Sequence, residues 1–507
     1  MRRFVSAIAL GFILAASGPA LAAERDSVTV AAPWEITSVD PSVSGFAFQR
    51  MQVAETLVDA DATGRLRPGL AGSWEVSEDG LVWRFAIRDG VRFHDGTELT
   101  AEAAARAIAR AAERPGVLSK APLAKVRGEE NAVVIALSEP FAALPALLTH
   151  ATTVILAPTA FADDGAAKTA IGTGPFRVET FSPPQSMTLA RFEDYWGPKP
   201  TLREARYLAA GRAETRALLA ESGDADLVFT LDPSGFARLG SAERVKTDAV
   251  PIPRVVTLKV NAGHPFLADP RARRALSLAV DRAGIAAGIT RFPEAGATQL
   301  FPPALGGWHD SDLEPLAHDP EDARRLLAEL GWAPGPDGVL AKDGQRFALT
   351  LRTFPDRPEL PLIAAALQDQ WRSIGIELAV SVGSYSEIPA GHQDGSLEIG
   401  LYARNYGVSP DPIGTLLADF GKGGGDWGAM GWDNADVAGA LAAIARTADP
   451  EARMPEIAKV TEALQAELPV IPIVWYQHTV AVAKDLKGAI IDPLERSYGL
   501  SGVSWTE

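Results

Sequence analysis

The chain has 507 residues, of which 47% are hydrophobic and 22% charged, and its formal net charge is −16. This composition is typical of a soluble globular protein, and the length predicts two or three compact units rather than one core. The acidic excess argues against a nucleic-acid partner, which needs a basic face to neutralise phosphates. Cysteine is absent, which excludes disulfides, thiolate metal sites, cysteine nucleophiles and a lipid-modified N-terminal cysteine.

The first residues have the pattern of a secretory signal peptide. Arg2 and Arg3 form a basic start, residues 4–16 are apolar but too few to span a bilayer, and the small residues at 20–22 predict cleavage after Ala22. An uncleaved membrane anchor is the alternative, although no stop-transfer charge pattern follows. We therefore expect a signal peptide over 1–22 and a mature protein that is exported, not lipidated and free in the periplasm.

Strand and helix patterns alternate along the mature chain. In the first part they predict a strand at 27–31, a helix at 48–58, hairpin strands at 73–76 and 82–87, and a helix capped by Thr100 that runs to Ala112. Later they predict helices at 270–285, 320–330, 360–374 and 450–466, and strands at 255–260, 347–351, 376–380, 398–402 and 470–476. This alternation indicates an α/β fold with a mixed or mostly parallel sheet flanked by helices.

Two proline-rich joints divide the chain. The first is Val250-Pro251-Ile252-Pro253, and the second is Leu468-Pro469-Val470-Ile471-Pro472. The residues after the second joint are too few to form a domain, so we expect them to return to the first lobe. Two lobes joined by two chain crossings form a hinge, and the cleft between such lobes is the usual place for a ligand.

The motifs of enzymes and preformed metal sites are missing from the sequence. It contains no G-x-S-x-G, H-E-x-x-H, G-x-x-x-x-G-K or post-strand G-x-G-x-x-G pattern. The glycine-rich run 420–425 has Leu416 where a phosphate loop needs its first glycine, and is interpreted as a flexible loop. The seven histidines are scattered, and no two have helical i, i+3 or i+4 spacing. The spacing of the histidines does not exclude a metal site assembled from distant segments.

Short sequence words, in order over essentially the whole mature chain, resemble those of the extracellular solute-binding proteins of family 5. These words are RPGLAGSW at 67–74, EDGLVWRF at 78–85, RDGVRFHDG at 88–96, IGTGPF at 171–176, YWG at 195–197, LKVN at 258–261, DPRARRAL at 269–276 and LPVIP at 468–472. Members of this family are periplasmic peptide- and nickel-binding components of ATP-binding-cassette (ABC) importers.

The resemblance implies an α/β two-lobe periplasmic binding protein of type II, cluster C, with an extra N-terminal subdomain and an interlobe cleft. With the two joints, it predicts lobe I over 23–254 plus 479–507, an inserted subdomain at about 58–158, and lobe II over 255–478. The conserved-looking words themselves are interpreted as turns and core, since Asp-Gly and Gly-Thr-Gly-Pro are turn sequences.

The resemblance divides between two branches of the family. Peptide-binding members carry an aspartate before an acidic-proline pair to hold the ligand's α-amino group, but Val408 stands at that position before Asp411-Pro412. The local text is more similar to the nickel-binding branch, in which Tyr406 matches a pocket tryptophan and Arg404 an upstream arginine. That branch's pocket histidine falls in the glycine-rich run, and its chelator-binding arginine falls near His150. We expect the chelate-binding fold to be kept and the pocket to be rewritten.

Eight residues are candidates for ligand contact. Arg404 could clamp a carboxylate, Tyr406 offers a ring face and a hydroxyl, and Asn405 lies between them. The remaining candidates are the first-lobe residues Phe46, Phe48 and His150 and the tryptophans that flank the glycine-rich run, Trp427 and Trp432. An internal ion pair for Arg404, core packing for the aromatics and a structural role for His150 are the alternatives. Arg50 is expected to be solvated.

The function we expect is that of a non-enzymatic periplasmic receptor of an ABC importer. It would capture a small amino-acid-derived solute, either a metal chelate or a short peptide, and deliver it to the membrane permease as a monomer. No cofactor is expected, apart from a metal carried inside the transported chelate. The alternatives are a di- or oligopeptide receptor proper without the usual aspartate, an exported hydrolase, and a sensor that docks to a chemoreceptor.

Overall fold

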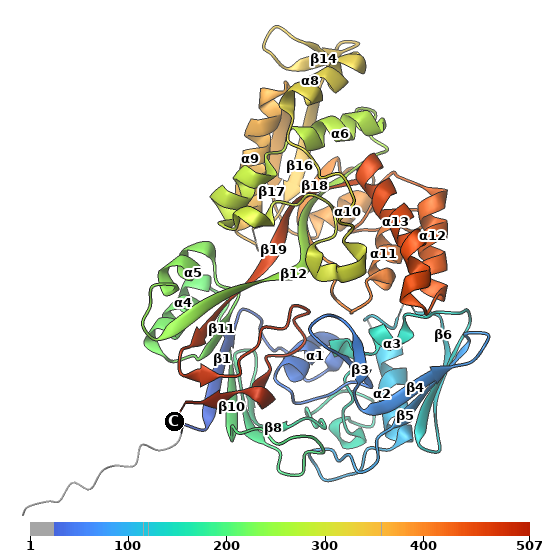
Figure 1. The fold of residues 1–507 in the computed structure, drawn as a ribbon, viewed down its shortest axis with the longest axis vertical. Helices are drawn as coiled ribbons and strands as arrows, with labels where there is room; N and C mark the ends of the chain where they lie inside the picture. Colours follow the sequence, from blue (N-terminus) through green and yellow to red (C-terminus); the bar gives the residue numbers. More distant parts are fainter. Residues whose placement is uncertain (1–24, 115, 120, 356, 507) are drawn as a thin grey trace, which may run out of the picture.

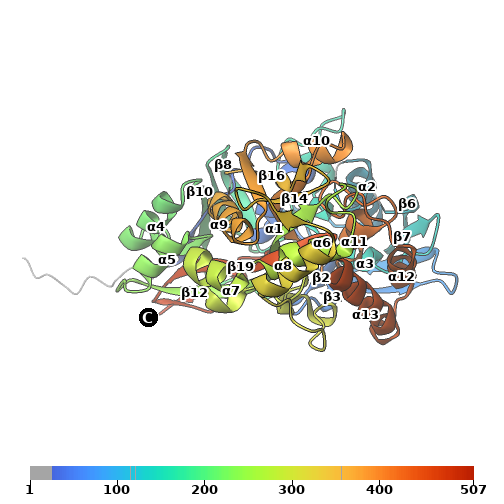
Figure 2. The same cartoon turned by 90° about the horizontal axis from the view of Figure 1, so that it is seen from above.

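The computed structural model describes residues 25–114, 116–119, 121–355 and 357–506. The expected signal peptide at 1–22 lies outside these residues. Two lobes are stacked along the long axis of the molecule, and the chain crosses between them in β12 and β19 (Figure 1). Seen from above, helices lie on both sides of the strands of the upper lobe (Figure 2).

One mixed sheet of ten strands runs through both lobes. Its order is β17-β16-β18-β12-β19-β11-β1-β10-β9-β8, and its parallel pairs are β1–β10, β1–β11, β16–β17 and β16–β18. The strands are β1 (Ser27–Ala32), β8 (Phe176–Ser182), β9 (Ser186–Arg191), β10 (Glu204–Ala209), β11 (Leu227–Phe229), β12 (Val245–Val260), β16 (Ala348–Thr353), β17 (Glu377–Val382), β18 (Ile399–Asn405) and β19 (Val470–Ala483). The predicted α/β class with a mixed sheet is confirmed.

Lobe I carries a smaller four-stranded sheet, ordered β4-β5-β7-β6, with α2 packed on it. Its elements are β4 (Ala71–Val76), β5 (Val82–Ile87), α2 (Ala101–Glu113), β6 (Leu123–Glu129), β7 (Ala132–Leu137) and α3 (Leu144–Leu147). The other lobe I elements are α1 (Pro41–Arg50), β2 (Val58–Ala60), β3 (Leu66–Pro68), α4 (Ala213–Ser222), α5 (Pro233–Leu239), β20 (Leu486–Lys487) and β21 (Ser504–Trp505). The predicted hairpin 73–87 is present, and the Thr100 side chain caps α2 by accepting from the Ala103 amide.

Lobe II contains most of the helices. They are α6 (Pro270–Leu278), α7 (Arg282–Ile285), α8 (Pro320–Glu329), α9 (Glu359–Ser373), α10 (Glu387–Gln393), α11 (Ile413–Phe420), α12 (Ala435–Arg446) and α13 (Pro450–Glu467), with short strands β13 (Ala333–Pro334), β14 (Leu340–Lys342) and β15 (Gln345–Arg346). Helices α6, α8 and α13 begin with proline in the first turn, as expected.

Four predicted elements were wrong in extent. The helix expected at 48–58 runs from Pro41 to Arg50, because Asp40 caps it by accepting from the Ser42 amide. The helix expected at 270–285 breaks after Leu278, and Asp281 starts a second short helix by accepting from the Gly284 amide. The strand expected at 255–260 is the end of β12, which has 16 residues because the proline joint 250–253 lies inside it rather than between elements, and the strand expected at 470–476 continues to Ala483 as β19, with 14 residues.

The hydrophobic cores meet between the lobes. One cluster of buried side chains contains Leu144 and Leu147 of lobe I as well as Leu416, Leu441 and Ile444 of lobe II. Beside them the Ala142 amide donates to the Ala445 carbonyl over 2.7 Å. The lobes therefore touch on the side where α3 faces α12, as well as at the crossing strands (Figure 1).

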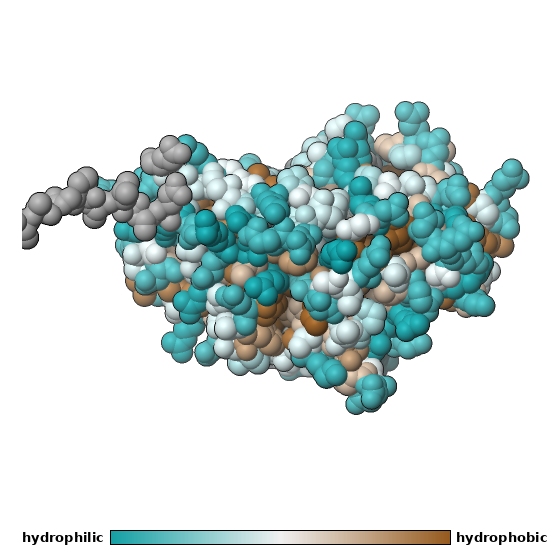
Figure 3. Space-filling view, turned by 90° about the horizontal axis from the view of Figure 1, so that it is seen from below, coloured by the Kyte–Doolittle hydropathy of each residue, from teal (hydrophilic) through white to brown (hydrophobic). Residues whose placement is uncertain are grey.

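The exterior fits the acidic composition. Seen from the lobe I end, the surface is mostly hydrophilic, with hydrophobic residues in separate patches (Figure 3). Among the described residues, none of the helices has the length and apolar character needed to cross a membrane.

Candidate functional site at the lobe junction

The strands β12 and β19 cross between the lobes, where the hinge is expected (Figure 1). They pair antiparallel from Val245 opposite Ala483 to Pro251 opposite Gln477, and pairing resumes in a shifted register at Val255 opposite Trp475. Proline lacks the N–H that a ladder needs, so Pro251 and Pro253 interrupt the hydrogen bonding at this point. The interruption places the Arg254 side chain where the two lobes meet.

A buried carboxylate lies beside this interruption. Glu495 accepts from Arg254 Nη2 over 2.7 Å, its Oε1 lies 3.3 Å from His478 Nδ1, and Arg50 Nε donates to its carbonyl oxygen over 2.6 Å. Burial alone would raise the pKa of Glu495, but Arg254, His478 and Arg50 hold it well below its usual range. The expectation that Arg50 is solvated was wrong, because its side chain is 14% exposed and bound to Glu495.

Tyr476 connects this cluster to lobe II. Its hydroxyl donates to Glu359 Oε1 over 2.8 Å and accepts from Arg357 Nη1 over 3.0 Å. The guanidinium groups of Arg254 and Arg357 lie 5.2 and 5.3 Å from the centre of its ring. Burial raises the pKa of Tyr476 to about 12, so it stays a neutral donor. Within the part of the chain that the structure describes, Arg357 has Tyr476 as its hydrogen-bond partner and no carboxylate in direct contact, although Glu359 and Glu495 attract its charge from farther away.

Aromatic rings complete the lobe I side of this junction. The Arg50 guanidinium lies 4.2 Å from the centre of the Trp34 ring and 5.6 Å from that of Phe46. The two rings meet edge to face at 6.5 Å.

The junction as a whole contains three arginines, Arg50, Arg254 and Arg357, and two glutamates, Glu359 and Glu495. The excess of guanidinium charge is suited to a carboxylate.

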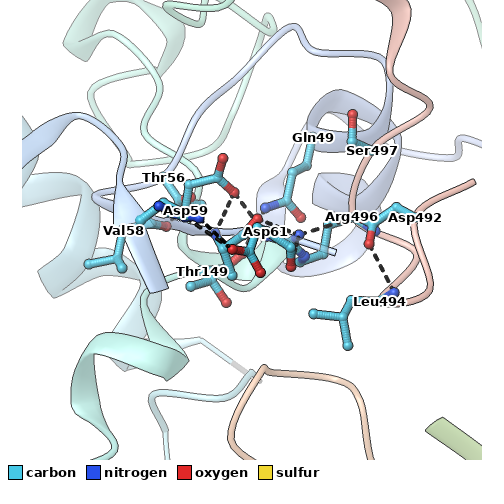
Figure 4. A network of polar contacts seen from close by, with 12 residues as sticks. Gln49, Thr56, Val58, Asp59, Asp61, Thr149, Asp492, Leu494, Arg496 and Ser497 are labelled. Atoms are coloured by element: carbon cyan, nitrogen blue, oxygen red, sulfur yellow. Dashed lines mark hydrogen bonds and ion pairs between the residues drawn. The ribbon is translucent and has the colours of Figure 1, made fainter. Parts of the chain in front are cut away.

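The C-terminal segment that carries Glu495 is tied to lobe I (Figure 4). Arg496 donates to Asp59 Oδ1 over 2.9 Å and to the Ala60 carbonyl over 2.6 Å. Asp492 accepts from the amides of Leu494 and Arg496 at 2.9 and 3.0 Å. These bonds fix the backbone on both sides of Glu495.

The predicted contacts of lobe II are engaged inside that lobe. Arg404 Nε and Nη2 donate to the two oxygens of Asp419 over 2.6 and 2.7 Å. Tyr406 is 1% exposed and meets Phe301 edge to face at 5.4 Å, and Asn405 accepts from the Gly407 amide. The structure brings these three residues together at the end of β18, and their contact with a solute stays a prediction.

The tryptophans that flank the glycine-rich run are anchored. Trp427 packs against the Tyr402 ring at 5.2 Å, and Trp432 donates to Glu467 over 2.5 Å. The run itself folds tightly onto α11, because a Cβ at Gly425 or Gly428 would lie 2.1 Å from a carbonyl oxygen of that helix. Lys259 is fully buried beneath it and donates to the carbonyls of Gly425, Asp426 and Gly428. Residues 421–425 form a loop, as expected, and its end at Gly425 is anchored to α11 and to Lys259.

The remaining candidates belong to lobe I. Phe48 is fully buried and packs near Phe181, whereas Phe46 lies beside Arg50 at the junction. His150 caps the short turn 151–153, and burial, with Arg50 nearby, lowers its pKa to about 4. Among the described lobe I candidates, Phe46 has a ring contact with Arg50 of the arginine cluster, and His150 lies close enough to feel the charge of the same arginine.

Three of the sequence words have a structural explanation. His94 of the word at 88–96 bonds to both glycines of the word at 171–176, with 2.9 Å to the Gly174 carbonyl and 3.3 Å from the Gly172 amide. Glu55 accepts from Thr173, Tyr195 and Trp196. Burial raises the pKa of Glu55 to about 7, because its three partners are neutral. These contacts join the words at 88–96, 171–176 and 195–197 to one another or to Glu55 within lobe I.

Sequence reasoning missed the residues that carry the junction: Arg254, Arg357, Tyr476, His478 and Glu495. The available signals were an arginine directly after the proline joint and the charged run Arg357-Pro358-Glu359 before a helix. Neither signal indicates by itself that residues more than 200 positions apart meet.

Comparison with known proteins identifies the family. The model for the middle region of bacterial extracellular solute-binding proteins, family 5, matches residues 65–427. The chain belongs to this family. Among curated relatives of family 5, the nickel-binding periplasmic protein of Escherichia coli is 28% identical over 411 residues, or 78% of each chain. The glutathione-binding protein GsiB of Salmonella typhi is 26% identical over 510 residues, covering 97% of this chain and 96% of the relative.

Solved structures of family 5 proteins have the same fold. NikA from Brucella suis, in complex with Fe(III)-EDTA, matches with a TM-score of 0.86 at 23% identity, covering 95% of this chain and all of that one. The predicted two-lobe type II fold is confirmed.

Proposed function

We propose that the chain is the solute-binding component of an ABC importer and that it captures a small, amino-acid-derived solute through a carboxylate. We propose a carboxylate because of Arg357, whose guanidinium lies at the lobe junction and has a neutral hydroxyl as its hydrogen-bond partner. Family 5 membership and similarity to nickel- and glutathione-binding relatives support the receptor role. The protein acts without catalysis, as a monomer in the periplasm, and passes its solute to a membrane permease.

The solute is either a metal chelate or a short peptide, and both carry the required carboxylate. A metal ion belongs to this proposal only as cargo inside an organic chelate. Closure of two lobes around such a solute removes water from its charges, which strengthens the contact with guanidinium groups. A di- or oligopeptide receptor proper remains the alternative, with Val408 where an α-amino-binding aspartate would stand.

Native mass spectrometry of the protein purified from its own periplasm, with metal analysis of the same sample, tests the solute class. A copurified peptide without metal would reject the chelate, and a transition metal retained with an organic partner would reject the peptide. Retention of a solute without any carboxylate would reject the proposal itself.

Replacing Arg357 tests the residue that carries the proposal. Titration calorimetry with reduced glutathione and with the nickel–histidine complex as probes should show that Arg357→Gln weakens whichever probe binds by about 2–5 kcal/mol, because a buried carboxylate loses its charge partner. Arg372→Gln, on the exposed face of α9, is the matched control and should bind as the parent does. Equal affinity of both variants would remove Arg357 from the site.

A further inference from the structure

Glu495 has a backbone conformation that its residue type disfavours. Its φ is 55°, in the left-handed region where glycine is preferred and a side chain costs free energy. The neighbouring Asp492 and Arg496 hold the segment in place through the bonds to Leu494, Asp59 and Ala60. A residue kept in a strained conformation by its surroundings, with its side chain buried, points to a role for that side chain.

The Glu495 side chain reaches elements that are far apart in the chain. Its carboxylate is 6% exposed and meets Arg254 of β12 and His478 of β19, while its carbonyl accepts from Arg50 at the end of α1. One residue thus holds both hinge strands against the first helix of lobe I.

These contacts lie beside the register shift of the two strands that cross between the lobes. Arg254 falls between Pro251 and Val255, where β12 and β19 lose their register. From Arg254 the contacts continue over the Tyr476 ring to Arg357 and Glu359 of lobe II. A change at Glu495 therefore reaches the hinge first and the lobe II side of the junction through it.

We propose that Glu495 is a positioning residue of the solute site. Its carboxylate fixes the hinge strands relative to α1, which sets the angle between the lobes, and it takes up the charge of Arg50 and Arg254 so that Arg357 is the guanidinium left for the solute. The inference rests on the proposed function only in taking the movement of the lobes as the means of capture.

The test measures the distance between the lobes without any solute. The chain has no native cysteine, so spin labels on V76C of β4 and M454C of α13 report one distance, and both positions are exposed. In this labelled background Glu495→Gln keeps the size of the side chain and removes its charge. We expect a distance distribution that is broader and shifted to longer distances than that of the labelled parent. Superimposable distributions would overturn the proposal.

Glu130 provides a matched control for backbone strain. It also has a positive φ, 51°, but its side chain is 86% exposed in the turn between β6 and β7. Glu130→Gly should relieve the strain, keep or raise the melting temperature and leave the interlobe distance unchanged. Glu495→Gly relieves the same strain but should broaden the distance distribution. If Glu495→Gly behaves like Glu130→Gly in both measurements, the carboxylate has no positioning role.

A second variant covers the case in which Glu495→Gln does not fold because Arg254 is left without its carboxylate. Adding Arg254→Gln removes that charge, and the double variant should fold and still show the broadened distribution. A double variant with the parent's distribution would overturn the proposal. These measurements contain no solute, so their outcome is independent of whether the mass spectrometry and calorimetry support a carboxylate-bearing solute.

Discussion

At the scale of single residues, the sequence words at 88–96 and 171–176 bond to one another within lobe I. His94 illustrates this, since its Nδ1 accepts from the Gly172 amide and its Nε2 then carries the proton that bonds to the Gly174 carbonyl. Burial lowers its pKa to about 4. The neutral ring is therefore part of the folded structure, and protonation removes its acceptor.

This gives a prediction for acid stability. The pKa of His94 lies near 4 in the folded protein and near 6.5 in the unfolded chain, so its contribution is present above pH 6.5 and is lost as the pH falls towards 4, by about 3 kcal/mol. His94→Gln should melt at a lower temperature than the parent at pH 7.5 but lose less stability between pH 6.5 and 4. Thermal melts over this range check it. Exposed His318→Gln should run parallel to the parent, and a parallel curve for His94→Gln would contradict the prediction.

At the scale of elements, the backbone at and after the glycine-rich run packs directly on a helix. Glycines are typical of flexible loops, but here Gly425 and Gly428 are needed because the loop backbone lies directly on α11. On the buried side of the loop, Lys259 Nζ donates hydrogen bonds to three loop carbonyls. These bonds replace the water that the carbonyls would otherwise bind.

Removing this anchor should loosen the loop. Lys259→Met keeps the length of the side chain but leaves three carbonyls without their donor. The free energy needed to open the loop locally therefore falls. We expect faster amide hydrogen exchange at 421–430 by at least tenfold, measured by mass spectrometry, with little change in lobe I. Lys459→Met, on the exposed face of α13, is the control. Unchanged exchange at 421–430 would show that the glycine packing alone holds the loop.

At the scale of the whole molecule, the lobes share a hydrophobic contact away from the hinge. Leu147 lies within the cluster that extends into α11 and α12, and a Cβ at Gly414 would lie 3.7 Å from its Cδ2. Such a contact stabilises the arrangement in which the lobes touch, because parting them returns apolar surface to water.

Shortening Leu147 should therefore favour separation of the lobes. Leu147→Ala removes apolar contact from the interlobe cluster at a cost of about 2–4 kcal/mol, part of which applies only while the lobes touch. We expect a larger radius of gyration in small-angle X-ray scattering. Leu367→Ala makes the same deletion inside the core of lobe II and should lower the melting temperature without changing the radius. An equal radius for both variants would place Leu147 in the core of lobe I alone.

Sequence reasoning was more successful for the fold than for the site. The hairpin 73–87, the proline-started helices and the family follow from local patterns, because turns, caps and short words are local. The meeting of Arg50, Arg254 and Glu495 depends on the tertiary path of the C-terminal segment, which no local pattern specifies. Arg404 follows the strand expected at 398–402 but lies within β18, and its partner Asp419 lies on a helix, α11, that was not predicted.

The two crossings between the lobes are hydrogen-bonded neighbours in one sheet rather than independent tethers. A pair of strands about 5 Å apart resists shear within its own plane, yet it bends across that plane where the ladder is interrupted between Pro251 and Val255. We expect any rotation of the lobes to follow this bend, a mechanical preference that no individual contact imposes. If the proposed solute touches both lobes, we expect it to leave only when this bend opens, so the stiffness of a two-strand ribbon would contribute to residence time.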